Sequence, residues 1–205
     1  MNDKWLSVAM RLQSIAQAGL QYGKDPYDIA RYTELREIAA QLLAERTDLP
    51  PEKIHAVFCN ETGYQTPKLD TRAAVFSEGK ILLVHEADGT WALPGGWCDV
   101  DQSVASNTEK EVLEEAGLRV RAVRLIALQD WRLHNVRNYA HGVIKAFVLC
   151  ENLGGAFAEN PETTEARFFE KTALPAELAT QRSSKEQILL CFSAFENPDM
   201  PTQCD

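Results

Sequence analysis

Three glutamates near the middle of the chain have the spacing of a metal site. Glu111, Glu114 and Glu115 belong to the run EKEVLEEAGL. If residues 103–116 form one helix, at about 100° per residue, the three carboxylates share a face about 100° wide. Oxygen ligands gathered in this way suit Mg²⁺ or Mn²⁺. Glutamate is also common at exposed helix ends. These acids, however, oppose the helix macrodipole and have no basic partner at i+4, so we interpret them as metal ligands.

The residues around these acids resemble the signature of the Nudix hydrolases, G-x5-E-x7-R-E-U-x-E-E-x-G-U, in which U is a bulky aliphatic residue. The stretch from Gly96 to Leu118 follows this pattern, and the preceding WALPGGW resembles the approach strand of the family. Two positions depart from it: Gln102 replaces the first Glu, and Lys110 replaces the Arg. Lys110 keeps the charge but loses the planar fork. Because the three acids of the metal face are intact, we expect a working enzyme.

The resemblance implies a metal-dependent hydrolase that cleaves the diphosphate of a nucleoside diphosphate linked to another moiety, X. By position, Glu111, Glu114 and Glu115 match the acids that hold Mg²⁺ or Mn²⁺, and Glu111 also counts as catalytic. The Gly95 carbonyl is expected to add a ligand, because Gly95 and Gly96 allow a backbone geometry that turns a carbonyl inward. Bound metals would neutralise the diphosphate and lower the pKa of the attacking water.

The N-terminal half is similar to a particular Nudix subgroup. SIAQAGLQYGKDPYDIARYTELREIA, followed by CNETGYQTPK, resembles bacterial enzymes with an N-terminal helical domain that hydrolyse CDP-choline and, less selectively, ADP-ribose. Both departures from the signature are normal in that subgroup. The resemblance therefore implies CDP-choline, ADP-ribose or both as the substrate, and a nucleoside monophosphate and a phosphorylated X as products.

One further acid is predicted to take part in catalysis. Members of the family often place a carboxylate in a loop or strand edge near the scissile diphosphate, as general base or extra metal ligand. The run NPETTEARFFE offers Glu162 and Glu165. Both could equally be solvated loop acids. We favour Glu165, because it directly adjoins the predicted strand.

Three residues are candidates for binding the substrate. Arg72 begins the first strand of the catalytic domain and could meet a phosphate, although a surface ion pair would also explain it. Trp97 follows the signature glycine and could stack on a nucleobase or serve in packing. Trp131 is a second candidate for stacking, with Tyr139 and Arg132 nearby in the sequence.

Composition limits the function classes. The chain has 205 residues, 45% hydrophobic and 25% charged, which is typical of a globular protein. Its net charge of −9 makes nucleic acid an unlikely partner. The five cysteines are scattered, without a CxxC pair, so we expect reduced thiols and a cytoplasmic location. No run is apolar and long enough to span a membrane, so no membrane association is expected.

The elements fall into two parts. Helical periodicity predicts helices over 1–60, including a third one starting near Pro50 or Pro51, and residues 61–70 read as a linker. Residues 71–205 alternate strands with helices, including a hairpin centred on Glu78-Gly79 and a closing helix over 184–196. The predicted fold is α/β: a Nudix α/β/α sandwich with a mixed sheet, preceded by a small all-helical domain. We expect a homodimer formed through the helical domain.

Two other functions remain possible at this point. The first is removal of nucleotides from RNA 3′ ends, which the negative charge disfavours. The second is a sensor that binds a nucleotide without hydrolysing it, which the intact acids disfavour.

Overall fold

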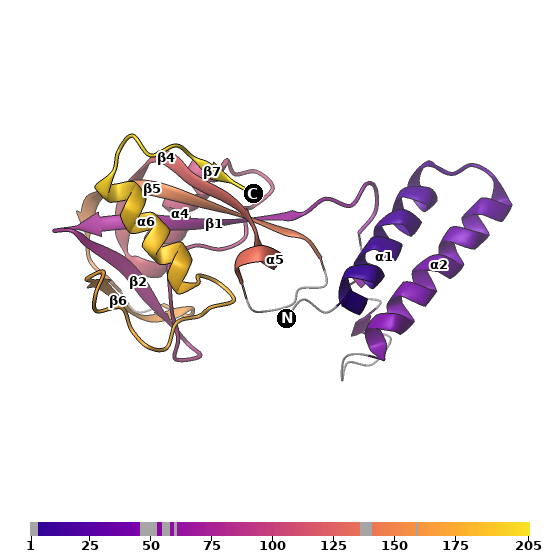
Figure 1. Cartoon of the computed structure of the whole chain (residues 1–205), viewed down its shortest axis with the longest axis horizontal. Helices are drawn as coiled ribbons and strands as arrows, with labels where there is room; N and C mark the ends of the chain where they lie inside the picture. Colours follow the sequence, from indigo (N-terminus) through magenta and orange to yellow (C-terminus); the bar gives the residue numbers. More distant parts are fainter. Residues whose placement is uncertain (1–3, 46–52, 55–57, 60, 136–140, 159) are drawn as a thin grey trace. The chain divides into compact units, whose positions relative to one another are not determined.

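The computed structural model describes residues 4–45, 53–54, 58–59, 61–135, 141–158 and 160–205. The chain divides into two compact units (Figure 1). The first is Met1–Pro67 with Asn138–Gly142, and the second is Lys68–Arg137 with Val143–Asp205. None of the described helices is long and apolar enough to cross a bilayer.

The first unit is built on two helices, α1 (Lys4–Tyr22) and α2 (Pro26–Ala44). Asp25 is the N-cap of α2: its side chain accepts from the amides of Tyr27 and Asp28, at 2.9 and 3.2 Å. The helices approach closely at Gly19, where an added Cβ would lie 2.3 Å from the Tyr32 ring. The third predicted helix falls mainly outside the described residues, but Ile54 and Phe58 are buried in this core.

The second unit holds a mixed sheet. Its strands are β1 (Lys68–Ser77), β2 (Lys80–Glu86), β3 (Trp91–Ala92), β4 (Leu118–Asp130), β5 (Val143–Gly155), β6 (Thr163–Phe169) and β7 (Gln203–Cys204). The order is β3-β2-β1-β5-β4-β7, and β6 pairs with β2. The pairs β1/β5 and β4/β7 are parallel, and the other pairs are antiparallel. The first strand starts within the predicted linker, because Lys68–Asp70 pair with the start of β5.

Alternating side chains divide the core between the two faces of this sheet. On one face, Ala74 and Phe76 of β1 pack with α6 (Lys185–Glu196). On the other, Ala73 and Val75 pack with α4 (Val104–Ala116). Figure 1 shows α6 in front of the sheet and α4 behind it. The predicted α/β/α sandwich and the preceding helices are confirmed.

The predicted hairpin is also confirmed. Glu78 and Gly79 join β1 to β2 with φ of 50° and 73°, and Ser77 pairs with Lys80. Two positive φ values in a two-residue loop define a type I′ turn, whose twist matches that of the strands. Strand β3 lies in the stretch WALPGGW, which the sequence analysis compared with the approach strand of the family. The sequence interpretation missed the short elements β7 and α5 (Trp131–His134).

Candidate active site

Helix α4 carries the three acids and is fixed at both ends. Ser103 accepts from the amide of Ser106 in a capping box, and Gly117 ends the helix in the left-handed conformation. Val112 and Ala116 are fully buried against the sheet. The caps and the packed face together set the rotation of α4, and therefore the direction of its acids.

The three acids lie in different surroundings. Glu111 and Glu115 are 8% and 3% exposed, whereas the side chain of Glu114 is 59% exposed. Burial raises the pKa of Glu111, and it raises the pKa of Glu115 to about 7, although the nearby Arg72 guanidinium opposes this second shift. Two buried carboxylates side by side are costly unless a cation compensates them.

The glycine loop is tied to both the acids and β1. The Gly95 amide donates to Glu115 Oε2 at 2.8 Å. The carbonyls on either side, of Pro94 and Gly96, accept from the amides of Ala73 and Thr71 at 2.9 and 2.8 Å. The loop therefore continues the sheet while its centre faces α4.

Both glycines are required by close approaches. Gly95 has a φ of 142°, and an added Cβ would lie 1.9 Å from the carbonyl oxygen of Thr71. At Gly96 an added Cβ would lie 2.8 Å from Glu111 Oε2. The first glycine lets the loop approach β1, and the second leaves room for a carboxylate.

Lys110 corrects the sequence-based view that the acids lack a basic partner. Its ammonium lies 2.8 Å from Asp99 Oδ2 and 3.5 Å from a carboxylate oxygen of both Glu111 and Glu114. Glu114 lies four residues after Lys110, a base-to-acid spacing that the sequence interpretation overlooked. The hydrogen bond to Asp99 holds the pKa of Lys110 well above its usual range. Lys110 thus links the loop before α4 to the acidic face of the helix.

Arg72 is buried, not on the surface. Its Nε and Nη2 donate to the two carboxylate oxygens of Asp70 at 2.8 and 2.7 Å, and Nη1 donates to the Leu93 carbonyl at 3.2 Å. The surface ion pair considered from the sequence is therefore wrong, since both side chains are almost wholly buried. The phosphate contact of Arg72 stays a prediction.

The two tryptophans differ in exposure. Trp97 is 44% exposed, and its backbone bridges to Asp70. Trp131 is 1% exposed, which favours a packing role for its ring in this conformation. Arg132 pairs with Asp130, and Tyr139 lies outside the described residues. Stacking by either tryptophan stays a prediction.

The two loop acids have different partners. Glu165 lies opposite His85 in the β2/β6 pair, and it is engaged by Arg167, whose Nε lies 2.8 Å from Glu165 Oε1. Glu162 lies just before β6 and lines a cavity of about 410 Å³. The next residue, Thr163, donates to the Glu115 carbonyl at 2.6 Å. The hydrogen bond of Thr163 therefore places its neighbour Glu162 near the end of α4, whereas Glu165 lies two residues further along β6.

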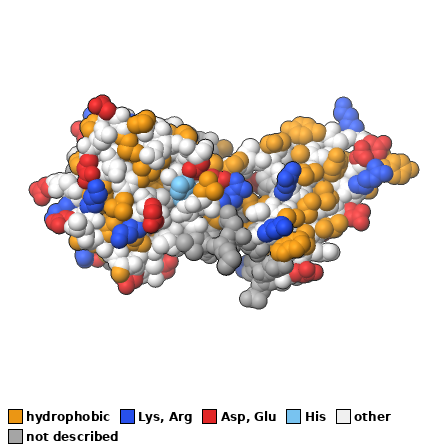
Figure 2. All heavy atoms as spheres, in the orientation of Figure 1, with side chains coloured by type: hydrophobic (Ala, Val, Ile, Leu, Met, Phe, Trp, Pro, Cys, Tyr) orange, Lys and Arg blue, Asp and Glu red, His pale blue; other side chains and the backbone are white. Residues whose placement is uncertain are grey.

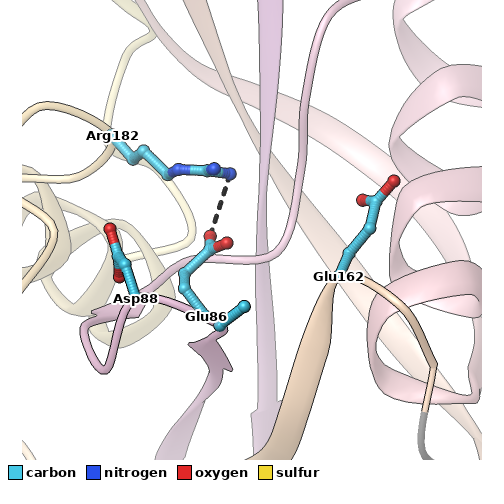
Figure 3. A pocket seen from close by; sticks show the side chains of 5 residues that line it. Glu86, Asp88, Glu162 and Arg182 are labelled. Atoms are coloured by element: carbon cyan, nitrogen blue, oxygen red, sulfur yellow. Dashed lines mark ion pairs between the residues drawn. The ribbon is translucent and has the colours of Figure 1, made fainter.

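The cavity contains residues that the sequence interpretation missed. Besides Glu162 it is lined by Glu86, Ala87, Asp88 and Arg182 (Figure 3). A signal existed for Glu86, because this carboxylate ends a strand with the apolar centre ILLV. Arg182 comes from a segment remote in sequence, which no local pattern could connect with β2.

The donor set fits a hard divalent cation, although the acids do not converge on one point. Among the described residues, no three acidic, histidine or cysteine side chains lie close enough together to hold an ion. Glu115 is turned to the Gly95 amide and Glu114 is paired with Lys110. Binding a cation would require these side chains to turn. The positive charge of the ion would then offset the cost of burying the carboxylates of Glu111 and Glu115.

Comparisons with known proteins cover both units. Residues 3–58 match the family model described as "UDP-X-like, N-terminal oligomerisation domain", and residues 66–190 match the NUDIX domain. A protein of Bacillus subtilis (strain 168), YjhB, described as a candidate ADP-ribose pyrophosphatase, is 39% identical over 206 residues. That match covers 100% of this chain and 99% of the relative.

Two solved structures are also similar. An ADP-ribose pyrophosphatase from Streptococcus suis 89-1591 is 51% identical, with a TM-score of 0.64, over 68% of this chain and 100% of that one. A UDP-X diphosphatase is 32% identical, also with a TM-score of 0.64, over 97% of both chains. With the site geometry, these matches show that the chain is a member of the Nudix hydrolase family, with the N-terminal domain of the UDP-X-like subgroup.

Proposed function

We propose that this Nudix hydrolase is a metal-dependent pyrophosphatase that cleaves a nucleoside diphosphate-X, with ADP-ribose, CDP-choline or both as substrate. The products are a nucleoside monophosphate and a phosphorylated X. The single observation that carries the proposal is the burial of Glu111 and Glu115 against the Gly95-Gly96 loop. The relatives described as ADP-ribose pyrophosphatases support the ADP-ribose alternative.

Mg²⁺ or Mn²⁺ would be held by Glu111, Glu114, Glu115 and the Gly95 carbonyl. When bound, such an ion neutralises negative charge on the diphosphate and lowers the pKa of the water molecule that it holds. The Gly95 amide points to Glu115. The Gly95 backbone thus approaches the acidic helix, which supports a role for the Gly95 carbonyl.

The chain's own residues would orient the substrate and accept the proton. Glu162 and Glu165 are the two proposed bases, and the position of Glu162 in the cavity favours it over Glu165. Trp97 is the exposed ring available for stacking on the nucleobase. Arg72 would act on the phosphates mainly through its charge, since its nitrogens are engaged by Asp70 and Leu93. Trp131 would contribute by packing behind the site.

A homodimer formed through the helical unit is part of the proposal. The matching N-terminal model is described as an oligomerisation domain. Figure 2 shows hydrophobic side chains gathered on the surface of the helical unit. Those of α1 and α2 that are exposed include Ile15, Tyr22, Tyr27 and Ile38.

The test is a substrate screen with the purified protein. ADP-ribose, CDP-alcohols, nucleotide sugars and dinucleoside polyphosphates are incubated with Mg²⁺ or Mn²⁺, and the same reactions are run with EDTA. We expect metal-dependent release of a nucleoside monophosphate. A protein that hydrolyses none of them with either metal, yet binds nucleotides tightly, would instead be a sensor.

A further inference from the structure

The cavity beside the metal face has a mixed polar lining. Glu86 ends β2, Asp88 follows it, Glu162 precedes β6, and Arg182 lies before α6 (Figure 3). The link from Thr163 to the end of α4 places this cavity next to the proposed metal site. None of its lining residues is among the proposed metal ligands. The cavity is therefore placed to receive a part of the substrate beyond the diphosphate.

Glu86 presents an acceptor that is not satisfied by the described residues. The residue is only 6% exposed. Its Oε1 lies 2.9 Å from Arg182 Nη1, but the described part of the chain gives that oxygen no aligned hydrogen bond. Buried carboxylate oxygens in folded proteins nearly always receive hydrogen bonds. A hydroxyl group entering the cavity could supply the missing one.

Arg182 is held in place through its backbone. The ammonium of Lys145, a residue only 1% exposed on β5, donates to the carbonyl of Gln181 at 2.9 Å and to that of Arg182. The preceding carbonyl, of Thr180, accepts from Asn135 Nδ2 at 2.8 Å. Three successive carbonyls are thus anchored, while the Arg182 side chain keeps 39% exposure and has several N–H donors. Lys145 is a positioning residue for Arg182.

The lining therefore combines carboxylate acceptors with a guanidinium donor. Vicinal hydroxyls, which both donate and accept, can satisfy both kinds of group at once. A quaternary ammonium has no N–H to donate and no lone pair to accept from Arg182, and it prefers aromatic faces. The lining residues include no aromatic ring.

We propose that this cavity binds the X moiety and favours a sugar-like X with vicinal hydroxyls, with Glu86 and Arg182 as specificity-determining residues. The proposal rests on the proposed function, because it assigns the X half of the same substrate. Within that function it favours a nucleoside diphosphate sugar over a nucleoside diphosphate choline.

The test compares two substrates that share their nucleoside diphosphate, CDP-glucose and CDP-choline. We expect the ratio of their kcat/KM values, sugar over choline, to fall about tenfold to a hundredfold in the double variant Glu86→Gln/Arg182→Met. This double variant removes both charges, so no buried carboxylate loses its only counter-charge. Thermal unfolding checks that it is folded. The control is Arg121→Met, an exposed arginine paired with Glu151, which should leave the ratio unchanged.

A binding measurement separates failure of this inference from failure of the proposed function. Calorimetric titration with ribose 5-phosphate, in the presence of Mg²⁺, should show binding to the wild-type protein that the double variant loses. If substrates are turned over, an unchanged ratio or an equal loss on both substrates overturns the cavity assignment and leaves the hydrolase intact. If no substrate is turned over, the proposed function fails. The titration then decides the cavity assignment: binding that the double variant loses supports it, and any other result overturns it.

Discussion

The amide of Gly95 donates a 2.8 Å hydrogen bond to Glu115 Oε2, which joins the glycine loop to the acidic helix. Gly95 has a φ of 142° there, and a Cβ added to it would lie 1.9 Å from the Thr71 carbonyl oxygen. Glu115 is buried on the other side of the contact. The backbone of the loop and the carboxylates of α4 therefore form one unit. A substitution in the loop should displace the carboxylates, and a substitution of the carboxylates should disturb the loop.

Alanine substitutions at the two adjacent glycines should have separate effects. Gly95→Ala forces a side chain into a glycine-only conformation and onto a backbone oxygen 1.9 Å away. We expect it to lower the free energy of unfolding by at least about 2 kcal/mol. Gly96→Ala meets only the mobile end of Glu111, at 2.8 Å. It should change stability by less than about 1 kcal/mol while displacing that carboxylate.

Urea unfolding and Mn²⁺-dependent hydrolysis measure these two effects. Gly96→Ala should remain folded and lose at least about tenfold in kcat/KM, with weaker Mn²⁺ binding. If both variants lost the same stability, the positive φ and the close backbone contact of Gly95 would not be a special requirement of that position.

Glutamine variants of Glu114 and Glu115 should both lose activity but differ in stability, because the two carboxylates lie in different surroundings. Glu114→Gln and Glu115→Gln each remove a proposed ligand charge, so kcat/KM should fall by at least about 100-fold. Burial raises the pKa of Glu115 to about 7, so stability falls as the pH rises from the unfolded-state pKa of about 4.3 to that value, and the full cost is present above it. At pH 8 without metal, Glu115→Gln should therefore gain up to about 3 kcal/mol of stability. Glu114 is largely exposed, and its replacement should change stability by less than about 0.5 kcal/mol. Retained turnover in both variants would contradict the metal assignment.

The acidic face could be predicted because it depends only on residues that are close together in the sequence. Helical spacing alone brings Glu111, Glu114 and Glu115 together, and the caps Ser103 and Gly117 bound the helix where the sequence indicates. The hairpin at Glu78-Gly79 follows from local turn chemistry in the same way.

The cavity could not be predicted, because its residues meet only through tertiary structure. Glu86 and Arg182 are separated by almost half of the chain, and their ion pair depends on how the segment before α6 is anchored to β5. A surface ion pair was an alternative for Arg72 because nothing local reveals that this part of β1 is buried between β5 and the loop that contains Pro94 and Gly96. Burial of charged residues is set by the sheet order, which local periodicity does not encode.

Isosteric variants of the two loop acids should identify the general base. Loss of a general base typically lowers the rate by about 10²–10⁴. We expect such a loss in kcat for Glu162→Gln, together with loss of the acid limb of the pH-rate profile. Glu165→Gln should stay within about threefold of wild type, since Glu165 is exposed and engaged by Arg167. The reverse pattern would assign the base to Glu165, as the sequence interpretation favoured.

The helical unit should carry the dimer contact. Ile15 of α1 and Ile38 of α2 are 47% and 43% exposed. Placing a charge at either position, as Ile15→Glu or Ile38→Glu, should convert a dimer to a monomer at micromolar concentration, because a buried unpaired charge is costly. Sedimentation velocity measures the mass. Leu153→Glu, at a 53% exposed site on β5, is the control and should remain dimeric. A wild-type protein that is monomeric at this concentration would contradict the assignment.

Lys145 should give the protein a stability that rises with pH above neutrality. Burial lowers the pKa of this ammonium to about 7. In the unfolded chain its pKa would return to about 10.4, so between these values the unfolded state binds more protons and stability increases with pH. From pH 6 to pH 9, the free energy of unfolding of the wild type should gain about 2–3 kcal/mol relative to Lys145→Met. Urea titrations at each pH measure it, and taking the difference cancels other titrating groups. Lys171→Met, which removes a half-exposed lysine paired with Glu196, should follow the wild-type slope. Parallel curves for the wild type and Lys145→Met would mean that Lys145 keeps an ordinary pKa, with the cost of its burial offset by the Gln181 and Arg182 carbonyls.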